Sequence, residues 1–318
     1  MAEPDYGEVR SVTSDVVADS ALRGDDVPAG ACDCHVHVFG SPVAFPFSAS
    51  RAYTPPEASV TQLCALHDAL GLGRCVVVQA SPYDADNRCL VSALGALGAR
   101  ARGVAVVAPD VGEHELERLH ADGVRGARLN LSRVGPGEGD AAVRAVKALD
   151  AVVSDYKWHI QLYCDLTTAA YTSRVFSKLP IKAQLVFDHF AGASAETDPN
   201  GDAWRSVLDL LSDHRGYVKI SATYRRFPGA ESNSVVDELA RSLLAANPDR
   251  VVWGSDWPHT AAGPKEPGRI DAVVPFQRID DHQALHRARA WCATDEVTQA
   301  VFVDNPARLY DFDADRPV

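Results

Sequence analysis

From residue 31 onward, short apolar runs rich in β-branched residues alternate with longer segments in which apolar residues recur every three or four positions. Most of the short runs are continuously apolar, which is typical of strands in a parallel sheet covered on both faces. The pattern predicts eight strands. They are Cys32–Phe39, Cys75–Ala80, Gly103–Ala108, Gly126–Leu131, His159–Tyr163, Gln184–Asp188, Tyr217–Ser221 and Val251–Trp253.

The longer segments have the periodicity of amphipathic helices. Among them are Val60–Leu70, Glu113–Ala121, Ala141–Val153, Trp204–Ser212 and Val235–Ala246. Eight strand–helix units in a chain of 318 residues fit a (β/α)8 barrel, which takes about 250 residues. The alternative, a doubly wound open sheet, favours a glycine-rich loop after its first strand, and the segment HVHVFGSP is not one. The predicted fold class is therefore α/β, a (β/α)8 TIM barrel with an N-terminal extension.

The extension comprises residues 1–30, in which acidic residues outnumber basic ones and large apolar side chains are sparse. We interpret this segment as an acidic N-terminal arm. Residues 31–318 then form a single barrel domain, since the alternation of strands and helices continues without a break to the end of the chain.

The formal net charge of −12 narrows the choice of partners. An acidic chain without a basic run is a poor candidate for binding nucleic acid or an anionic membrane surface. No apolar stretch approaches the ~20 residues of a membrane span, and the first residues do not form a secretory signal. The seven cysteines are scattered, which indicates neither a disulfide framework nor a cysteine-rich zinc site. We expect a protein of the reducing cytoplasm, and the pattern leaves the oligomeric state open.

Candidate chemistry begins in the first strand, where Asp33, His35 and His37 are spaced by two. Because side chains alternate along a strand, these three are expected to share one face, with Cys34 and Val36 on the other. In a closed barrel that face is the interior, so the histidines would lie at its mouth. A pair of histidines bonded to backbone groups in a polar loop is the structural alternative.

Two further groups follow apolar strands. His189 comes just after the sixth strand, and Asp256 just after the eighth. Barrel enzymes carry their chemistry at the carboxyl ends of the strands. Three histidines and one aspartate there suit either a mononuclear metal site or a metal-free carbonyl clamp with a carboxylate base. Taken singly, His189 could be a core histidine and Asp256 a helix N-cap.

Basic and tyrosine side chains form a second set at the same strand ends. Guanidinium groups match carboxylate or sulfonate oxygens in a bidentate way. Several arginines at one mouth of an acidic protein therefore predict a substrate with two or more anionic groups. The set consists of Arg51, Tyr53, Arg128, Arg133, Tyr163, Arg225 and Arg226, and for Arg226 we prefer a surface ion pair.

In the order and spacing of these motifs, the chain resembles the amidohydrolase superfamily of the amidohydrolase 2 type, in particular the branch of pyrone-dicarboxylate lactonases and related lactone hydrolases. The resemblance runs from about Asp33 to Tyr310. The motifs that carry it are DCHVHVFG, FPFSASRAYTPP, VVVQASPYDADNR, GVRGARLNL, WHIQLY, VFDHFAG, VVWGSDWPH and DNPARLY.

The resemblance implies a lactonase that opens the ring of a small anionic lactone, such as a pyrone dicarboxylate or a muconolactone. Its implied catalytic residues are His35, His37 and His189 around the lactone carbonyl, with Asp256 as the base that activates water. The implied substrate-binding residues are Arg51, Tyr53, Arg128, Arg133, Tyr163, Arg225 and His259. Family lactonases carry a second pair of basic residues after strand four, where this chain keeps only Arg133, so the exact substrate stays open.

The resemblance also bears on cofactors. A binuclear centre needs a bridging lysine on strand four, and the segment GARLNL has none. A single Zn²⁺ held by His35, His37, His189 and Asp256 is typical of the superfamily, whereas the pyrone-lactonase branch can act without metal. We therefore expect no metal or one weakly bound divalent ion. The alternatives are a mononuclear zinc-dependent decarboxylase or hydratase and, in another class, a catalytically silent barrel that binds an anionic metabolite.

Overall fold

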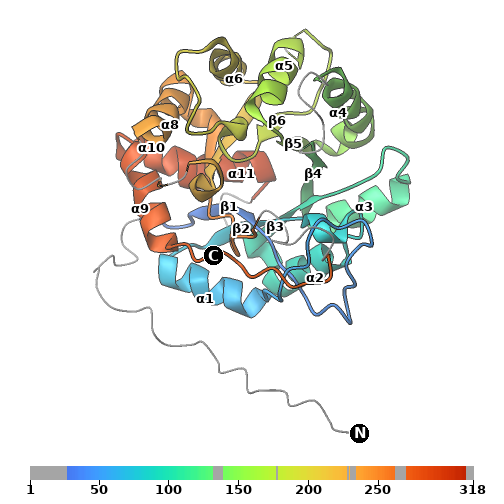
Figure 1. Ribbon diagram of the computed structural model, residues 1–318. Coiled ribbons are helices and arrows are strands. Elements are labelled where there is room, and N and C mark those ends of the chain that lie inside the picture. The colour runs from blue at the N-terminus through green and yellow to red at the C-terminus, as the bar shows by residue number, and fades with distance from the viewer. Residues whose placement is uncertain are drawn as a thin grey trace, which may run out of the picture.

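The computed structural model describes residues 27–131, 139–176, 178–227, 229, 234–261 and 270–312. Eight parallel strands, each hydrogen-bonded to the next in chain order, form a barrel surrounded by helices (Figure 1). The predicted (β/α)8 barrel is confirmed. The strands are β1 (Cys32–Val36), β2 (Arg74–Val78), β3 (Ala101–Ala105), β4 (Val124–Asn130), β5 (His159–Tyr163), β6 (Leu185–Phe187), β7 (Gly216–Ser221) and β8 (Val251–Gly254).

The helices bury their apolar stripes against the outer face of the strands. Predicted helices Val60–Leu70 and Glu113–Ala121 have the predicted bounds. The helices are α1 (Val60–Leu70), α2 (Arg88–Leu97), α3 (Glu113–Ala121), α4 (Gly139–Val153), α5 (Leu166–Phe176), α6 (Asp202–Ser212), α7 (Thr223–Arg226), α8 (Ser234–Ala246), α9 (Asp281–Trp291), α10 (Asp295–Gln299) and α11 (Asn305–Tyr310).

Helix α1 shows why a sequence with these signals forms a helix of that length. It begins at a capping box, in which the Ser59 hydroxyl accepts from the backbone N–H of Gln62 and the Gln62 side chain accepts from the backbone N–H of Ser59. It ends at Gly71, whose φ of 71° is a left-handed conformation that a glycine adopts without a Cβ penalty.

The barrel closes between β1 and the residues directly after β8. The backbone N–H of Asp256 donates to the carbonyl of His35 at 2.9 Å, and the N–H of His37 donates to the carbonyl of Trp257 at 2.8 Å. Closure therefore holds the end of β1 against the segment that carries Asp256, so two of the predicted chemical elements are joined by backbone hydrogen bonds.

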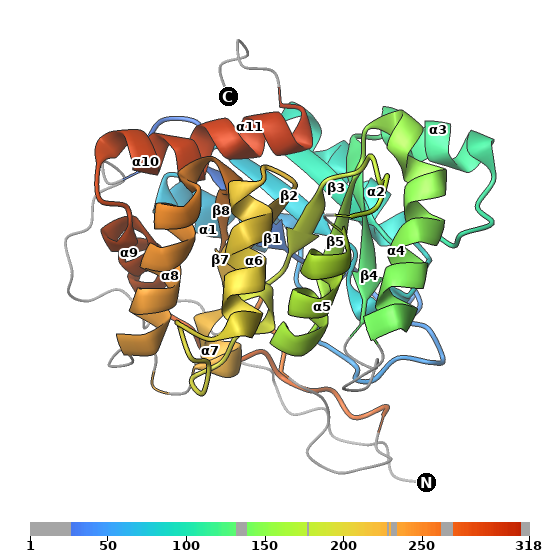
Figure 2. The same cartoon turned by 90° about the horizontal axis from the view of Figure 1, so that it is seen from above.

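The interior of the barrel has an apolar lower layer at the amino ends of the strands. Tyr310, at the end of α11, and Phe312 pack against this layer at the amino ends of the strands. Figure 2 shows α11 at this end of the barrel, at the top of the view, and α7 at the opposite end, at the bottom. The inward side chains that meet them are Cys32, Cys34, Val76, Val78, Val104, Val186, Tyr217 and Val252. The two aromatic rings thus close the barrel at the amino ends of its strands. The active site is therefore confined to the carboxyl ends.

Three further predictions concern the N-terminal arm, membrane-spanning helices and the cysteine thiols. Residues 1–26 of the predicted acidic arm lie outside the described residues, while Val27 packs against the core between strands and helices. Within the described ranges no helix is both long and apolar enough to cross a membrane. All seven cysteines belong to those ranges, and each is a free thiol.

The prediction that Asp33, His35 and His37 share one face, with Cys34 on the other, is wrong for Asp33, which points outward, and for Cys34, which points inward. The β1–β2 register passes from Asp33↔Cys75 to Val36↔Val77, so β1 carries one extra residue opposite β2. Such a bulge reverses the alternation beyond it. Asp33 consequently points outward, where its Oδ2 lies 3.4 Å from Nε2 of His67 in α1. Its Oδ1 accepts from the backbone N–H groups of His35 and Ser255 and so fastens the bulge.

The bulge requires a residue without a side chain on the neighbouring strand. A Cβ added to Gly254 in β8 would lie 2.7 Å from Cβ of His35 and 2.8 Å from its backbone nitrogen. Real Cβ atoms do not approach backbone this closely, so any side chain at Gly254 displaces β1 where it carries His35.

We therefore expect Gly254→Ala to lower the free energy of unfolding by about 1–3 kcal/mol, the range of an overpacked core. Gly95→Ala is the matched control. Gly95 lies in the interior of α2 with open space around its Cβ position, so the change there should be neutral or stabilise by up to about 1 kcal/mol. Urea unfolding curves of both variants provide the measurement, and equal stability would contradict the proposed clash.

Candidate active site

A cavity of about 600 Å³ opens at the carboxyl ends of the strands. Most of the residues that sequence reasoning selected meet there. Those lining the cavity are His37, Arg51, Tyr53, Arg128, Tyr163, His189, Arg225 and Asp256. Two selected residues are not in this lining, His35 and His259, and Arg133 lies outside the described residues.

Backbone turns at the strand ends aim the side chains into this cavity. The chain leaves the extended conformation after Asp188, and His189 has a φ of 49°. Asp188 and His189 can therefore both point inward although they are adjacent. Asp256 likewise has a φ of 65°. Left-handed conformations cost non-glycine residues about 1–2 kcal/mol each, and such strain is concentrated at functional sites.

Asp256 has two different carboxylate oxygens. Its Oδ2 accepts from Arg225 Nε at 2.5 Å and from the Tyr224 hydroxyl at 2.7 Å. Its Oδ1 is buried and accepts no hydrogen bond from the described residues. Instead it faces the Nε2 atoms of three histidines, at 3.6 Å from His37, 3.7 Å from His35 and 4.0 Å from His189. One oxygen is thus held, and the other is available to a water or an ion.

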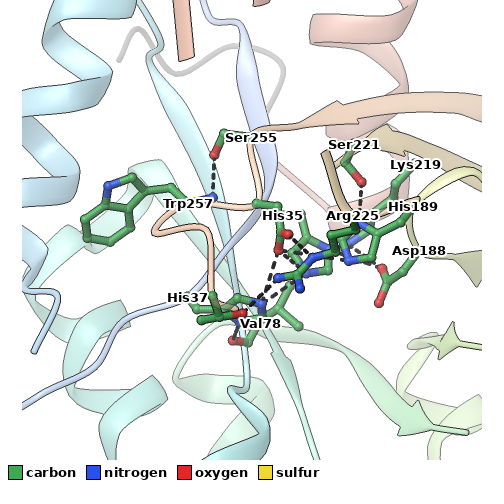
Figure 3. A network of polar contacts seen from close by, with 12 residues as sticks. His35, His37, Val78, Asp188, His189, Lys219, Ser221, Arg225, Ser255 and Trp257 are labelled. Atoms are coloured by element: carbon green, nitrogen blue, oxygen red, sulfur yellow. Dashed lines mark hydrogen bonds and ion pairs between the residues drawn. The ribbon is translucent and has the colours of Figure 1, made fainter. Parts of the chain in front are cut away.

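Each of these histidines is oriented through its other ring nitrogen. His37 Nδ1 lies 2.9 Å from the carbonyl oxygen of Val78, and His189 Nδ1 lies 2.8 Å from the hydroxyl of Ser221. His35 lies deeper in the barrel. Its Nδ1 is 3.2 Å from Oδ1 of Asp188, and its Nε2 is 3.3 Å from Nε2 of His37. Figure 3 shows the three rings gathered around the Arg225 side chain, with Asp188 and Lys219 on the side of His189.

Beneath the histidines lies a buried charged layer around Asp188. Its Oδ2 accepts from Arg128 Nη2 at 3.2 Å and from Gln161 Nε2 at 3.1 Å. Its Oδ1 lies 3.6 Å from Lys219 Nζ and 3.2 Å from His35 Nδ1. Burial alone would raise the pKa of Asp188, but His35 and Lys219 hold this pKa well below its usual range. Asp188 is therefore an anion with two cations beside it, Arg128 and Lys219.

Burial and neighbouring charges also set the ionisation of the upper residues. Burial lowers the pKa of His189 to about 4, against the opposing effect of Asp256. It lowers the pKa of His35 well below its usual value, although Asp188 opposes it. Burial would raise the pKa of Asp256, but Arg225 and His189 hold this pKa far below its usual range. At neutral pH, the site therefore presents neutral His35 and His189 rings beside an ionised carboxylate.

The donor set fits a single divalent cation. His35, His37 and Asp256 form one group of closely spaced ligand atoms, and His35, Asp188 and His189 form another. A tetrahedral Zn²⁺ with bonds of about 2.0–2.1 Å holds neighbouring ligand atoms about 3.3–3.4 Å apart. The observed separations begin at 3.3 Å between the two Nε2 atoms of His35 and His37. The unpartnered Oδ1 of Asp256 completes such a set.

The cavity walls carry more positive than negative charge. Arg51, Arg128 and Arg225 line it, against Asp84 and Asp256. Arg128 lies over the ring of Tyr163, with its guanidinium carbon 5.5 Å from the ring centroid. Arg51 pairs with Asp271, whose side chain is 90% exposed. In a protein of net charge −12, this concentration of guanidinium groups favours an anionic ligand.

His259 occupies a different place from the one predicted. Its Nε2 lies 3.1 Å from Oδ2 of Asp281, and its ring packs edge-on against Tyr224 at 5.5 Å between centroids. His259 thus supports Tyr224, which donates to Asp256, instead of lining the cavity.

Sequence reasoning missed three residues of the site: Asp188, Lys219 and Tyr224. Lys219 gave a readable signal, because a lone lysine in the otherwise apolar strand YVKIS shares the inward face with Tyr217 and Ser221. Asp188 belongs to the motif VFDHFAG, but strict alternation along a strand allows only one of two adjacent side chains, Asp188 or His189, to point inward. Tyr224 comes from the short helix α7, whose position no apolar pattern indicates.

The chain is similar to known proteins both in sequence and in fold. The amidohydrolase family model matches residues 32–312. A 2-pyrone-4,6-dicarboxylate hydrolase of Comamonas testosteroni is 34% identical over 295 residues, covering 89% of this chain and 91% of that protein. A 4-sulfomuconolactone hydrolase of Hydrogenophaga intermedia is 28% identical over 288 residues, covering 89% of each. A solved structure from Pseudomonas putida is 26% identical, with a TM-score of 0.74 over 91% of this chain and 100% of that one.

We expect Asp188→Asn to lower the free energy of unfolding at pH 7 by about 3–5 kcal/mol, since it leaves Arg128 and Lys219 without their buried counter-charge. The Asp188 pKa is lower in the folded than in the unfolded protein. Its stabilisation is therefore present above about pH 4 and is lost as the pH falls toward the folded pKa, and the variant should lack this loss.

Urea unfolding from pH 7 to pH 3 measures both effects. The control is Asp271→Asn, which removes the exposed partner of Arg51 and should cost less than about 1 kcal/mol. A variant at position 188 as stable as this control would show that Asp188 is not the counter-charge of the buried layer.

Proposed function

The chain belongs to the amidohydrolase family, and on that premise we propose that it is a lactonase, which opens the ring of a small anionic lactone with water. The observation that carries the proposal is the buried Oδ1 of Asp256, which faces three imidazoles at a cavity and accepts no hydrogen bond from the described residues. A carboxylate held through one oxygen and available through the other is the arrangement that a general base for water requires.

In the proposed reaction, water lies between Asp256 Oδ1 and the lactone carbonyl carbon. The water oxygen forms a bond to that carbon while its proton passes to Asp256, and the carbonyl oxygen becomes an oxyanion. The ring C–O bond then breaks, and the proton held by Asp256 passes to the departing ring oxygen. The product is an open-chain acid bearing a hydroxyl group or its keto tautomer, so atoms and charge balance.

The hydrogen bonds of the histidines divide their roles. The carbonyl of Val78 only accepts, so His37 carries a hydrogen on Nδ1 and, when neutral, has a lone pair on Nε2, which faces His35 and not the substrate carbonyl. The Ser221 hydroxyl can donate to Nδ1 of His189, and we assign this direction, which places the hydrogen of the neutral ring on Nε2. His189 is thus the donor we assign to the developing oxyanion.

A divalent ion, when bound by His35, His37, His189 and Asp256, would supply Lewis-acid polarisation of the carbonyl and a lower pKa for water. We propose no bridging second metal, because β4 offers no lysine ligand.

The substrate class is proposed from the walls of the cavity. Arg51, Arg128 and Arg225 can hold anionic substituents around the ring, and the Arg51–Asp271 pair is exposed enough for a substrate carboxylate to displace Asp271. Two relatives carry names that denote lactones with carboxylate and sulfonate groups. Both kinds of substituent suit a guanidinium.

A second candidate is a mononuclear metal-dependent decarboxylase or hydratase of a similar acid. The close spacing of the ligand atoms of His35, His37 and Asp256, with His189 Nε2 4.0 Å from Asp256 Oδ1, favours it. Metal analysis of the purified protein separates the two candidates, because a stoichiometric ion and full loss of activity to a chelator, without ring opening, would support the second. A catalytically silent barrel would bind a lactone diacid and turn over none.

The test of the proposed function is a set of lactones bearing carboxylate or sulfonate groups, followed by the loss of ring absorbance in the ultraviolet. We expect turnover of at least one, and a fall in kcat of about 10²–10³-fold in His189→Ala, the cost of losing one main oxyanion donor. The control is His114→Ala, at an exposed position on α3. Near-normal turnover in the His189 variant would remove this histidine from the mechanism.

The anionic-substrate proposal has a separate test in Arg51→Met. Loss of one charge-assisted contact, about 1.5–3 kcal/mol, should raise KM for a diacid lactone roughly ten- to a hundredfold. A neutral lactone should show little change, because it never makes the contact. Arg88→Met, which removes an exposed arginine paired with Asp86, is the control. An equal loss for charged and neutral lactones would mean that Arg51 supports the loop and not the ligand.

A further inference from the structure

Lys219 is a fully buried lysine that the proposed reaction does not use. It points inward from β7, its side chain has no solvent exposure, and Figure 3 shows it beside His189 and Ser221. Its Nζ donates to the carbonyl of Cys34 at 2.9 Å and to Oε1 of Gln161 at 2.7 Å. An ammonium has three hydrogens, so one remains, and Nζ lies 3.3 Å from Nδ1 of His35.

A chain of donors and acceptors decides where that third hydrogen goes. His37 directs its Nδ1 hydrogen to the carbonyl of Val78, and with one hydrogen on the ring its Nε2 has a lone pair. His35 Nε2, at 3.3 Å, must then supply the hydrogen between the two rings. A neutral His35 with its hydrogen on Nε2 has a lone pair on Nδ1, and the lone pair accepts from Lys219.

Asp188 offers the alternative partner for His35. Its Oδ1 lies 3.2 Å from Nδ1 of His35, yet it accepts no hydrogen bond from the described residues. If His35 moved its hydrogen to Nδ1 and donated to Asp188, the lone pairs of His35 and His37 would face each other on their Nε2 atoms. Two lone pairs at that distance repel unless a cation lies between them, and a carboxylate behind a histidine is the usual support of a metal ligand.

We propose, relying on the proposed function for the identity of the site, that Lys219 is a positioning residue that selects the tautomer of His35. With Lys219 present, His35 carries its hydrogen on Nε2, and the histidine pair is self-contained without metal. Without the ammonium group, His35 donates to Asp188, and two lone pairs converge on a divalent cation. Lys219 thus lowers the affinity of the site for a divalent cation, whereas Asp188 raises it.

The first test reads the tautomer directly. In metal-free wild-type protein labelled with ¹⁵N-histidine, the ring resonances of His35, assigned by their absence in His35→Gln, should show a protonated Nε2 and an unprotonated Nδ1. In Lys219→Met, the protonated nitrogen should be Nδ1. The wild-type spectrum alone decides the matter if Lys219→Met does not fold, since a wild-type His35 protonated on Nδ1 overturns the proposal.

The second test measures zinc affinity by competition with a chromogenic chelator. We expect Lys219→Met to bind Zn²⁺ roughly ten- to a hundredfold more tightly than wild type, the size of effect that partners behind metal ligands exert. Lys219→Arg, which keeps the charge and the donors, should restore the weak wild-type affinity. Lys182→Met removes an exposed lysine and should change nothing.

Zinc bound by the cysteines is subtracted by repeating each titration with His37→Gln added, which removes one ligand of the site. Equal or weaker zinc binding in Lys219→Met than in wild type would overturn the proposal. Both readouts are independent of lactone turnover, so failure here leaves the lactonase proposal standing, and absence of lactone turnover leaves the tautomer result standing.

Discussion

The dry interior of the barrel imposes one requirement on which the site depends, namely that every charge below the cavity has a partner. Asp188 meets it, since Arg128 and Gln161 donate to one of its oxygens and Lys219 and His35 lie beside the other. A buried charge without compensation costs several kcal/mol, so these five side chains can be placed only together. Because His35 belongs to this group and touches His37, the rigid layer below determines the orientation of the reacting layer above.

Departures from regular strand geometry supply what a regular barrel cannot. An ideal strand sends every second side chain inward, whereas the bulge in β1 and the left-handed residues His189 and Asp256 concentrate more groups at the mouth. Each departure is tied to a neighbour, as Gly254 makes room for the bulge and Asp33 holds it from outside. The strain at these positions is therefore supported by the closure of the barrel.

These departures also explain which features were predictable from the sequence. Short apolar runs, most of them continuous, identified all eight strands, since strands of a sheet covered on both faces have this pattern. The outward position of Asp33 was not predictable, since a bulge is defined by two strands at once and period-two counting sees only one. Residues brought in by tertiary contacts alone escaped for the same reason, as with Tyr224 beside Asp256. His259 was selected from its motif, and its pairing with Asp281 depends on a helix 22 residues later.

The aromatic side chains that close the barrel at the amino ends of its strands affect how the protein folds during translation. Tyr310 and Phe312 complete the layer that six strands share, including Cys32 at the start of β1. During translation the first strand leaves the ribosome long before these rings do. The nascent barrel must therefore keep the amino ends of its strands open to water until Tyr310 and Phe312 have been translated. Transiently exposed apolar surface of this kind is prone to aggregation during folding, and Tyr310 and Phe312 are the residues that cover it.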